Sequence, residues 1–96
     1  MTHAITLIKS ETGKMDETLK YLRELMDQEN PFVNNVNITE CFISFGWPDF
    51  VLLLNGDNVE LLKDAIVKMR KLVLLKCKAN LETSTIICTS ANEINE

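Results

Sequence analysis

Hydrophobic and polar positions follow two periods along this chain, and together they predict four strands and two helices. Apolar and β-branched residues gather in short strand-like runs over residues 3–9, 36–45, 50–54 and 81–89. The four-three spacing of a helical face occurs over residues 14–29 and again from residue 57 to at least residue 71. A loose polar tail at 91–96 ends the chain.

The helix limits are predicted from local signals. The first helix has an apolar face of Met15, Leu19, Leu22, Leu25 and Met26, and Asn30-Pro31 ends it. Asn55-Gly56 is expected to be a turn, after which Asp57 and Glu60 resemble a capping box at the start of the second helix. The inward positions expected in that helix are Val59, Leu62, Ile66 and Met69. Residues 72–79 fit either a longer helix or the start of a strand.

This order of elements, βαββαβ, predicts a ferredoxin-like α+β domain with two helices on one face of a four-stranded antiparallel sheet. The other face of such a sheet is normally polar. Here, however, the runs Phe42-Ile43, 51–54 and Ile86-Ile87 place apolar side chains on both faces. A second copy of the chain would cover the exposed face, so we expect a homodimer that packs sheet against sheet. The polar segment 34–39 is expected to bend or bulge the second strand.

One connection carries more chemistry than a turn requires. Gly46-Trp47-Pro48-Asp49 joins two apolar strands and is expected to form a tight hairpin connection. Glycine and proline suit the turn itself, whereas the turn does not require the tryptophan or the aspartate. The hairpin is therefore the first place to look for a functional site.

Length and composition limit the class of protein. The 96 residues make a single domain, 1–96, and 46% hydrophobic with 25% charged residues indicates a folded globule. A net charge of −4 without a basic cluster argues against direct binding of nucleic acid. Three cysteines without CxxC spacing, no signal peptide and no membrane-length apolar segment favour a reducing cytoplasm and no membrane partner.

Catalytic chemistry is sparse in the sequence. The single histidine, His3, lies near the amino end, and paired cysteines that could join it in a metal site are absent. None of the serines lies in a nucleophile-elbow sequence, and three separated glycines cannot form a phosphate loop. We therefore expect no enzyme activity, no catalytic residues, no metal and no cofactor.

Binding chemistry is better represented. Asp49 offers a carboxylate to an ammonium group, and the backbone near Gly46 offers N–H donors to an anion, so the pair suits an amino acid. Trp47 could close over its side chain, while Thr83 and Thr85 could add hydroxyl contacts from one face of the last strand. Structural roles are the alternative: Asp49 as a turn cap, Trp47 as an interface residue and the threonines as good strand formers.

The sequence resembles the effector-binding (RAM) domain of the leucine-responsive/asparagine (Lrp/AsnC) regulator family. The resemblance covers residues 4–89 and rests on the Gly-x-x-Asp hairpin at 46–49, the apolar strand and the acid-started helix at Asp57. The closing strand with Thr83 and Thr85 is the second matching element. Because the first strand begins almost at Met1, the chain is similar to the stand-alone form, without a helix-turn-helix for DNA.

The resemblance implies a dimeric α/β barrel with back-to-back sheets that assembles further into octamers or related rings. It also implies that a small effector, commonly an amino acid, binds between subunits near Gly46 and Asp49, with a full-length regulator of the family as a partner in mixed assemblies. We therefore expect a stand-alone effector-sensing module. The alternatives are a small monooxygenase-like enzyme of the same topology, an amino-acid-binding module of the ACT type and a purely structural oligomerisation module.

Overall fold

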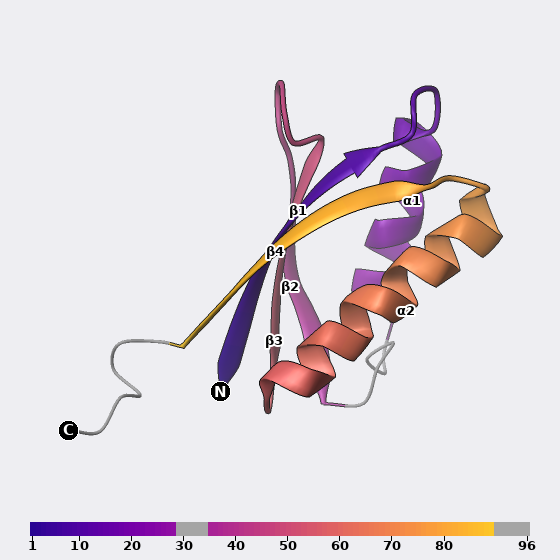
Figure 1. Cartoon of the computed structure of the whole chain (residues 1–96). Helices are drawn as coiled ribbons and strands as arrows, with labels where there is room; N and C mark the ends of the chain where they lie inside the picture. Colours follow the sequence, from indigo (N-terminus) through magenta and orange to yellow (C-terminus); the bar gives the residue numbers. More distant parts are fainter. Residues whose placement is uncertain (29–34, 90–96) are drawn as a thin grey trace.

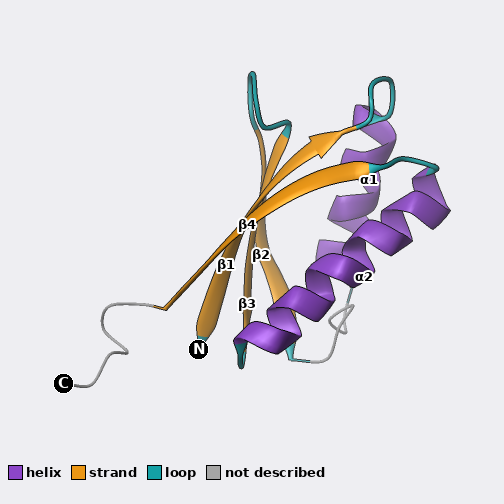
Figure 2. Cartoon of the chain, in the orientation of Figure 1, coloured by secondary structure: helices purple, strands orange, loops and turns teal. Residues whose placement is uncertain are grey.

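A computed structural model describes residues 1–28 and 35–89 of the chain. The elements are β1 (Thr2–Ser10), α1 (Met15–Met26), β2 (Val36–Ile43), β3 (Phe50–Gly56), α2 (Val59–Cys77) and β4 (Leu81–Thr89). This is the expected βαββαβ order of a ferredoxin-like α+β domain. Both helices lie on the same side of the sheet (Figures 1 and 2). No helix within the described ranges is long and apolar enough to cross a membrane.

The four strands form one antiparallel sheet in the order β2-β3-β1-β4. Its two central strands are β3 and β1, which pair with Leu53 opposite Ile5. The β2–β3 register shifts between Ile38 and Glu40, so β2 carries a bulge or irregularity where the polar stretch 34–39 predicted one. Residue 34 lies outside the described residues.

The hydrophobic core lies between the helices and one face of the sheet. Alternate residues of the central strands point into it, because successive side chains of a strand face opposite sides. Leu22 and Leu25 of α1 and a row of α2 residues complete it. The largest fully buried core side chains are Ile8, Leu22, Val36, Phe50, Leu52, Leu54, Leu62, Met69 and Val73.

The helix boundaries differ from the expected ones at several points. The α1 helix ends at Met26 instead of residue 29, and its C-cap is Asp27, whose N–H donates to the Arg23 carbonyl. Residues 29–31, with the expected Asn30-Pro31 stop, lie outside the described residues. Met15 and Val59 are exposed instead of inward-facing. Each is the first residue of its helix, before the turns that pack on the sheet.

The start of α2 also corrects the sequence interpretation. Residues 55–56 continue β3 instead of forming a turn, and the N-cap is Asn58, not Asp57. The Asn58 side chain accepts a hydrogen bond from the Leu61 N–H at 3.0 Å, which satisfies one of the free donors of the first turn. At the other end, α2 continues to Cys77 and so resolves the ambiguous 72–79 segment as largely helix. Lys78, with φ 56°, is its left-handed C-cap.

Gly56 lies at a close contact between the sheet and α2. A Cβ added there would lie 3.1 Å from the Asn35 carbonyl oxygen, 3.2 Å from Val36 Cγ2 and 3.4 Å from Leu62 Cδ2. Two of these atoms belong to the neighbouring strand region and one to the helix. Glycine at this position therefore allows α2 to begin directly behind the end of β3.

We expect Gly56→Ala to destabilise the protein by about 1–3 kcal/mol, because the added methyl group overpacks this contact. For a domain of this size that loss lowers the melting temperature by roughly 4–8 °C per kcal/mol. Thermal unfolding followed by circular dichroism measures the effect. An unchanged melting temperature would mean that the contact relaxes freely and that Gly56 is not required for the packing.

Candidate functional site

The connection between β2 and β3 is longer than the four-residue turn that the sequence predicts. The strands end at Ile43 and restart at Phe50, so Ser44 and Phe45 belong to the connection as well. The Ser44 N–H donates to the Asp49 carbonyl at 2.9 Å and closes its base. Gly46 has φ 119°, a backbone conformation that residues other than glycine rarely adopt.

Asp49 anchors this hairpin to the end of β1. Its N–H donates to the Ile8 carbonyl at 2.9 Å, and its carboxylate Oδ2 accepts from the Ser10 N–H at 2.8 Å. Ser10 is buried, and its hydroxyl lies 3.3 Å from the hydroxyl of buried Thr18 in α1. A continuous set of polar contacts therefore links the hairpin, β1 and α1 at one end of the sheet.

The tip of the connection carries two exposed aromatic side chains. Phe45 is fully exposed, and Trp47 retains 62% of its accessible surface. The connection extends past the end of the sheet (Figure 1). Within the protomer neither ring is packed into the core, so the aromatic tip formed by Phe45 and Trp47 is available for contacts outside the protomer.

The two threonines lie elsewhere. Thr83 and Thr85 face the helix side of β4, with Thr83 opposite Ile8 and Thr85 opposite Thr6. The Thr85 hydroxyl lies 3.1 Å from the Thr6 hydroxyl, within hydrogen-bond distance. Since β1 separates β4 from β3, Thr83 is about two strand spacings, or roughly 10 Å, from the β3 residue Phe50 that follows Asp49. The structure brings Gly46, Trp47 and Asp49 together on one connection and leaves the threonines apart from them.

A surface depression of about 330 Å³ adjoins the hairpin anchor. It lies where β1 ends and β4 begins, and Ser10 belongs both to its wall and to the Asp49 contact. The sequence interpretation missed its charged side chains, one cation and two acids, because Lys9 and Glu11 lie some seventy positions from Glu82 and meet it only through the β1–β4 pairing. The lining residues are Lys9, Ser10, Glu11, Thr12, Asn80, Leu81 and Glu82.

The surroundings of two thiols, those of Cys41 and Cys77, disfavour their reactive form. Burial raises the pKa of the Cys77 thiol, and the acidic side chains of Glu17 and Glu24 raise it further. Burial also raises the pKa of Cys41, opposed by Arg23. Since the thiolate is the nucleophile, a raised pKa keeps both groups in the less reactive thiol form. In the part of the chain that the structure describes, no cluster of three histidine, cysteine or acidic residues could hold a metal ion.

We expect Asp49→Ala to destabilise the protein by about 1–3 kcal/mol, because the buried Ser10 N–H loses its acceptor. Asp49→Asn keeps a carbonyl oxygen at the same place and should cost clearly less. Urea unfolding of the two variants side by side measures the difference. Wild-type stability of Asp49→Ala would show that the carboxylate does not anchor the hairpin.

Comparisons with known proteins show the fold. No protein-family model matches the chain, and no curated protein matches it significantly. The crystal structure of the hypothetical protein PHS023 from Pyrococcus horikoshii is similar over all of both chains, with 18% identity and a TM-score of 0.64. The structure of a glutamate-to-alanine mutant is similar to 99% of this chain over 56% of its own length, with 14% identity and a TM-score of 0.51. The chain thus has the small α+β fold of these solved structures.

Proposed function

We propose that this chain forms an effector-sensing module of the Lrp/AsnC RAM type. In this proposal two copies pair through the open faces of their sheets, and a small molecule, with an amino acid as the expected class, binds at the hairpin end. Binding favours one state of assembly and so modulates a transcriptional regulator of the same family in the cytoplasm. The observation that carries the proposal is the apolar face of the sheet opposite the helices.

All four strands contribute apolar side chains to that open face, on which Glu40 of β2 and Ser84 of β4 also lie. Leu53 lies opposite Ile5, and Ile5 lies opposite Ile86, so these three side chains form one row across the sheet. A second row runs from Phe42 through Val51 to Leu7. Phe42 and Ile86 keep about half of their accessible surface in the protomer, at 49% and 56%.

Exposed apolar rows of this kind favour the binding of a partner protein. A contiguous exposed apolar patch on a small protein commonly marks an interaction surface. A domain of this size also buries a modest share of its unfolded surface, so additional burial between subunits contributes substantially to its stability. A second copy is the natural partner, because it presents the same apolar rows and a two-fold contact needs only one self-complementary patch.

Effector binding is supported by the charges at the hairpin end. Asp49 is half-buried and uses Oδ2 for its contact with Ser10. We assign the ammonium group of the effector to this carboxylate, and its carboxylate to the backbone near Gly46, where an added Cβ would meet nothing within 4 Å. Lys9, in the adjoining depression, supplies a cation for the carboxylate, with Glu11 and Glu82 beside it. Trp47 covers the side-chain end of the effector.

The effector reaches a regulator through assembly. A ligand shifts an equilibrium only by the difference between its affinities for the two states. Because Asp49 is hydrogen-bonded to Ser10 of β1, a central strand of the proposed interface, an effector bound to Asp49 is coupled through this residue to the strand that pairs the subunits. Mixed assemblies with a full-length regulator would carry this bias to DNA without a nucleic-acid contact by this chain.

We expect Leu53→Lys to reduce the oligomer to the 10.9 kDa protomer, because a charge in the centre of the open face prevents apolar pairing. The protomer should stay folded, since the new lysine would lie opposite Glu40 across the β2–β3 pair. Sedimentation velocity measures the mass. The matched control is Val59→Lys at an exposed apolar position of α2, and an equal loss of mass in both variants would contradict the proposed interface.

We expect thermal unfolding against the twenty amino acids to show a selective stabilisation. A ligand at about 100 times its dissociation constant adds roughly 2.7 kcal/mol to the folded state. Asp49→Asn should abolish the shift, because it removes the charge that holds the ammonium group while it retains an acceptor for Ser10. A shift of the same size in this variant would place the effector elsewhere, and no shift with any amino acid would leave an assembly module without an amino-acid effector.

A further inference from the structure

A polar row crosses the open face at the end of the sheet opposite the hairpin. Directly opposite residues of paired strands point to the same face. The pairs that form the row are Asn37–Asn55, Asn55–His3 and His3–Cys88, one residue from each strand. In each strand a neighbouring residue packs in or against the core, so the row faces away from the helices. The start of β1 and the end of β4 meet here (Figure 1).

His3 and Cys88 are the members of this row that can bind a metal. The Cβ atoms of directly opposite residues in antiparallel strands lie about 4.5–5.5 Å apart. Tetrahedral Zn²⁺ holds an imidazole nitrogen at about 2.0–2.1 Å and a thiolate sulfur at about 2.3 Å, which places the two donor atoms about 3.5 Å apart. Side chains on neighbouring strands can reach that separation. The Cys88 thiol is also the exposed one, whereas Cys41 is half-buried and Cys77 is buried.

Asn55 supplies a second partner for the imidazole. Its side-chain oxygen Oδ1 is buried and has no hydrogen-bond partner among the described residues. The imidazole of His3, on the neighbouring strand, keeps one N–H when its other nitrogen binds a metal. Metal-bound histidines almost always donate this N–H to an oxygen acceptor, which fixes the orientation of the ring. Asn55 and Cys88 lie on opposite sides of His3, so the acceptor and the second ligand do not compete.

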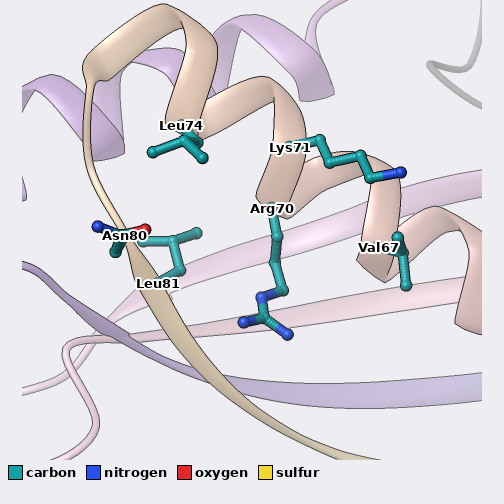
Figure 3. A pocket seen from close by; sticks show the side chains of 6 residues that line it. All are labelled: Val67, Arg70, Lys71, Leu74, Asn80 and Leu81. Atoms are coloured by element: carbon teal, nitrogen blue, oxygen red, sulfur yellow. The ribbon is translucent and has the colours of Figure 1, made fainter.

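The protomer offers two of the four ligands that a closed zinc site needs. Within residues 1–28 and 35–89 no group of three histidine, cysteine or acidic side chains could hold a metal ion, so no third ligand joins His3 and Cys88. The pocket beside α2 is not an alternative site, because its polar side chains are Arg70, Lys71 and Asn80, two cations and an amide (Figure 3). A second copy, paired through the open face, would bring the same two ligands again.

The spacing of packed sheets suits a shared metal and excludes a disulfide. Two sheets that pack face to face lie about 10 Å apart. Cysteines whose Cα atoms are more than about 7 Å apart cannot form a disulfide without movement of the backbone, so Cys88 does not reach its copy. A metal midway between the sheets lies about 5 Å from each, a distance that one side chain and one metal–ligand bond span. A two-fold axis along the strands brings each pair to its own copy.

We propose that His3 and Cys88 of two copies together bind one Zn²⁺ at the edge of the paired sheets, with Asn55 as the positioning residue of the imidazole. Two thiolates and two imidazoles in a tetrahedral arrangement are typical of zinc. The inference rests on the sheet pairing of the proposed function and adds a metal to it. The effector is assigned to the hairpin at the other end of the sheet, so the two sites are separate. Local spacing does not indicate this site, because its ligands meet only through the β1–β4 pairing.

Titration of the untagged protein with Co²⁺ tests the site, since Co²⁺ replaces Zn²⁺ and absorbs light and a tag would add histidines. We expect thiolate-to-cobalt charge-transfer absorption, with the intense visible bands of a tetrahedral site, that saturates at one metal per two chains and disappears on addition of Zn²⁺. Cys88→Ser and His3→Ala should each abolish the absorption. The matched control is Cys41→Ser, whose thiol packs against the core on the helix side, and it should leave the absorption unchanged.

The role of Asn55 has its own readout. Asn55→Leu should weaken Zn²⁺ binding by about 10–100-fold, because the imidazole loses the acceptor that orients it. The melting temperature of the metal-free variant should not fall, since the substitution removes a buried oxygen without a partner. Competition against a chelator of known affinity measures the binding. An unchanged affinity for Zn²⁺ would contradict the positioning role.

Sedimentation velocity with and without a chelator separates this site from the proposed function. A metal-free dimer that gives no cobalt–thiolate absorption would overturn the shared site and leave the sheet pairing intact. In Leu53→Lys, which removes the pairing, the tetrahedral signal should be lost. The same signal at one metal per chain in that variant would overturn the proposal, because the protomer would then complete the site alone. A wild-type protomer under both conditions would contradict the pairing and the shared site together.

Discussion

Two helices can cover only one face of a four-stranded sheet, and this chain has apolar side chains on both faces. The covered face is filled by a closely packed core, in which Ile8, Phe50 and Leu62 have no accessible surface. The other face presents rows of apolar residues that β1 and β3 bring to its centre. The proposed arrangement of subunits and the proposed position of the effector both depend on what covers that face.

The hairpin end of the sheet carries the polar groups that we propose bind the effector. Asp49 has a structural role that a purely functional interpretation would omit, because its carboxylate accepts the Ser10 N–H. This role also fixes the position of the carboxylate relative to β1 and so prepares it for a ligand. Anchoring and binding are therefore compatible at this residue, and the asparagine variant separates them because it retains an acceptor and removes the charge.

Periodicity predicted most of the fold. The limits of β4 agree with the expected 81–89, because alternating β-branched residues form a regular strand with a clear start. The ends of the helices were less accessible to sequence reasoning. Asp57 and Asn58 are both good N-cap residues. Asn58 is the N-cap because β3 extends through Gly56, which the local sequence does not indicate. The 72–79 segment is apolar enough for a strand, and its helical state follows from packing of Val73 and Cys77 in the core.

The candidate site was predicted in part. Gly46, Trp47 and Asp49 lie so close together in the sequence that their proximity in the structure could be predicted. The contact from Asp49 to Ser10 spans 39 positions, and the depression that joins Lys9 to Glu82 depends on the β1–β4 register. The Thr6–Thr85 contact is also long-range. It gives Thr85 a partner within the protomer, and no local sequence pattern indicates that partner. The local sequence does not contain the pairing register between distant strands, because that register depends on the strand order in the sheet.

The most direct test of the central claim, that a second copy covers the open face, is the dependence of the melting temperature on protein concentration. A protein whose folded state is an oligomer becomes more stable by mass action as its concentration rises, whereas a monomer does not. We predict a melting temperature that increases steadily over a hundredfold range of concentration, and a Leu53→Lys variant in which the slope is much smaller. A melting temperature independent of concentration, in a protein that sediments as a protomer, would contradict the account.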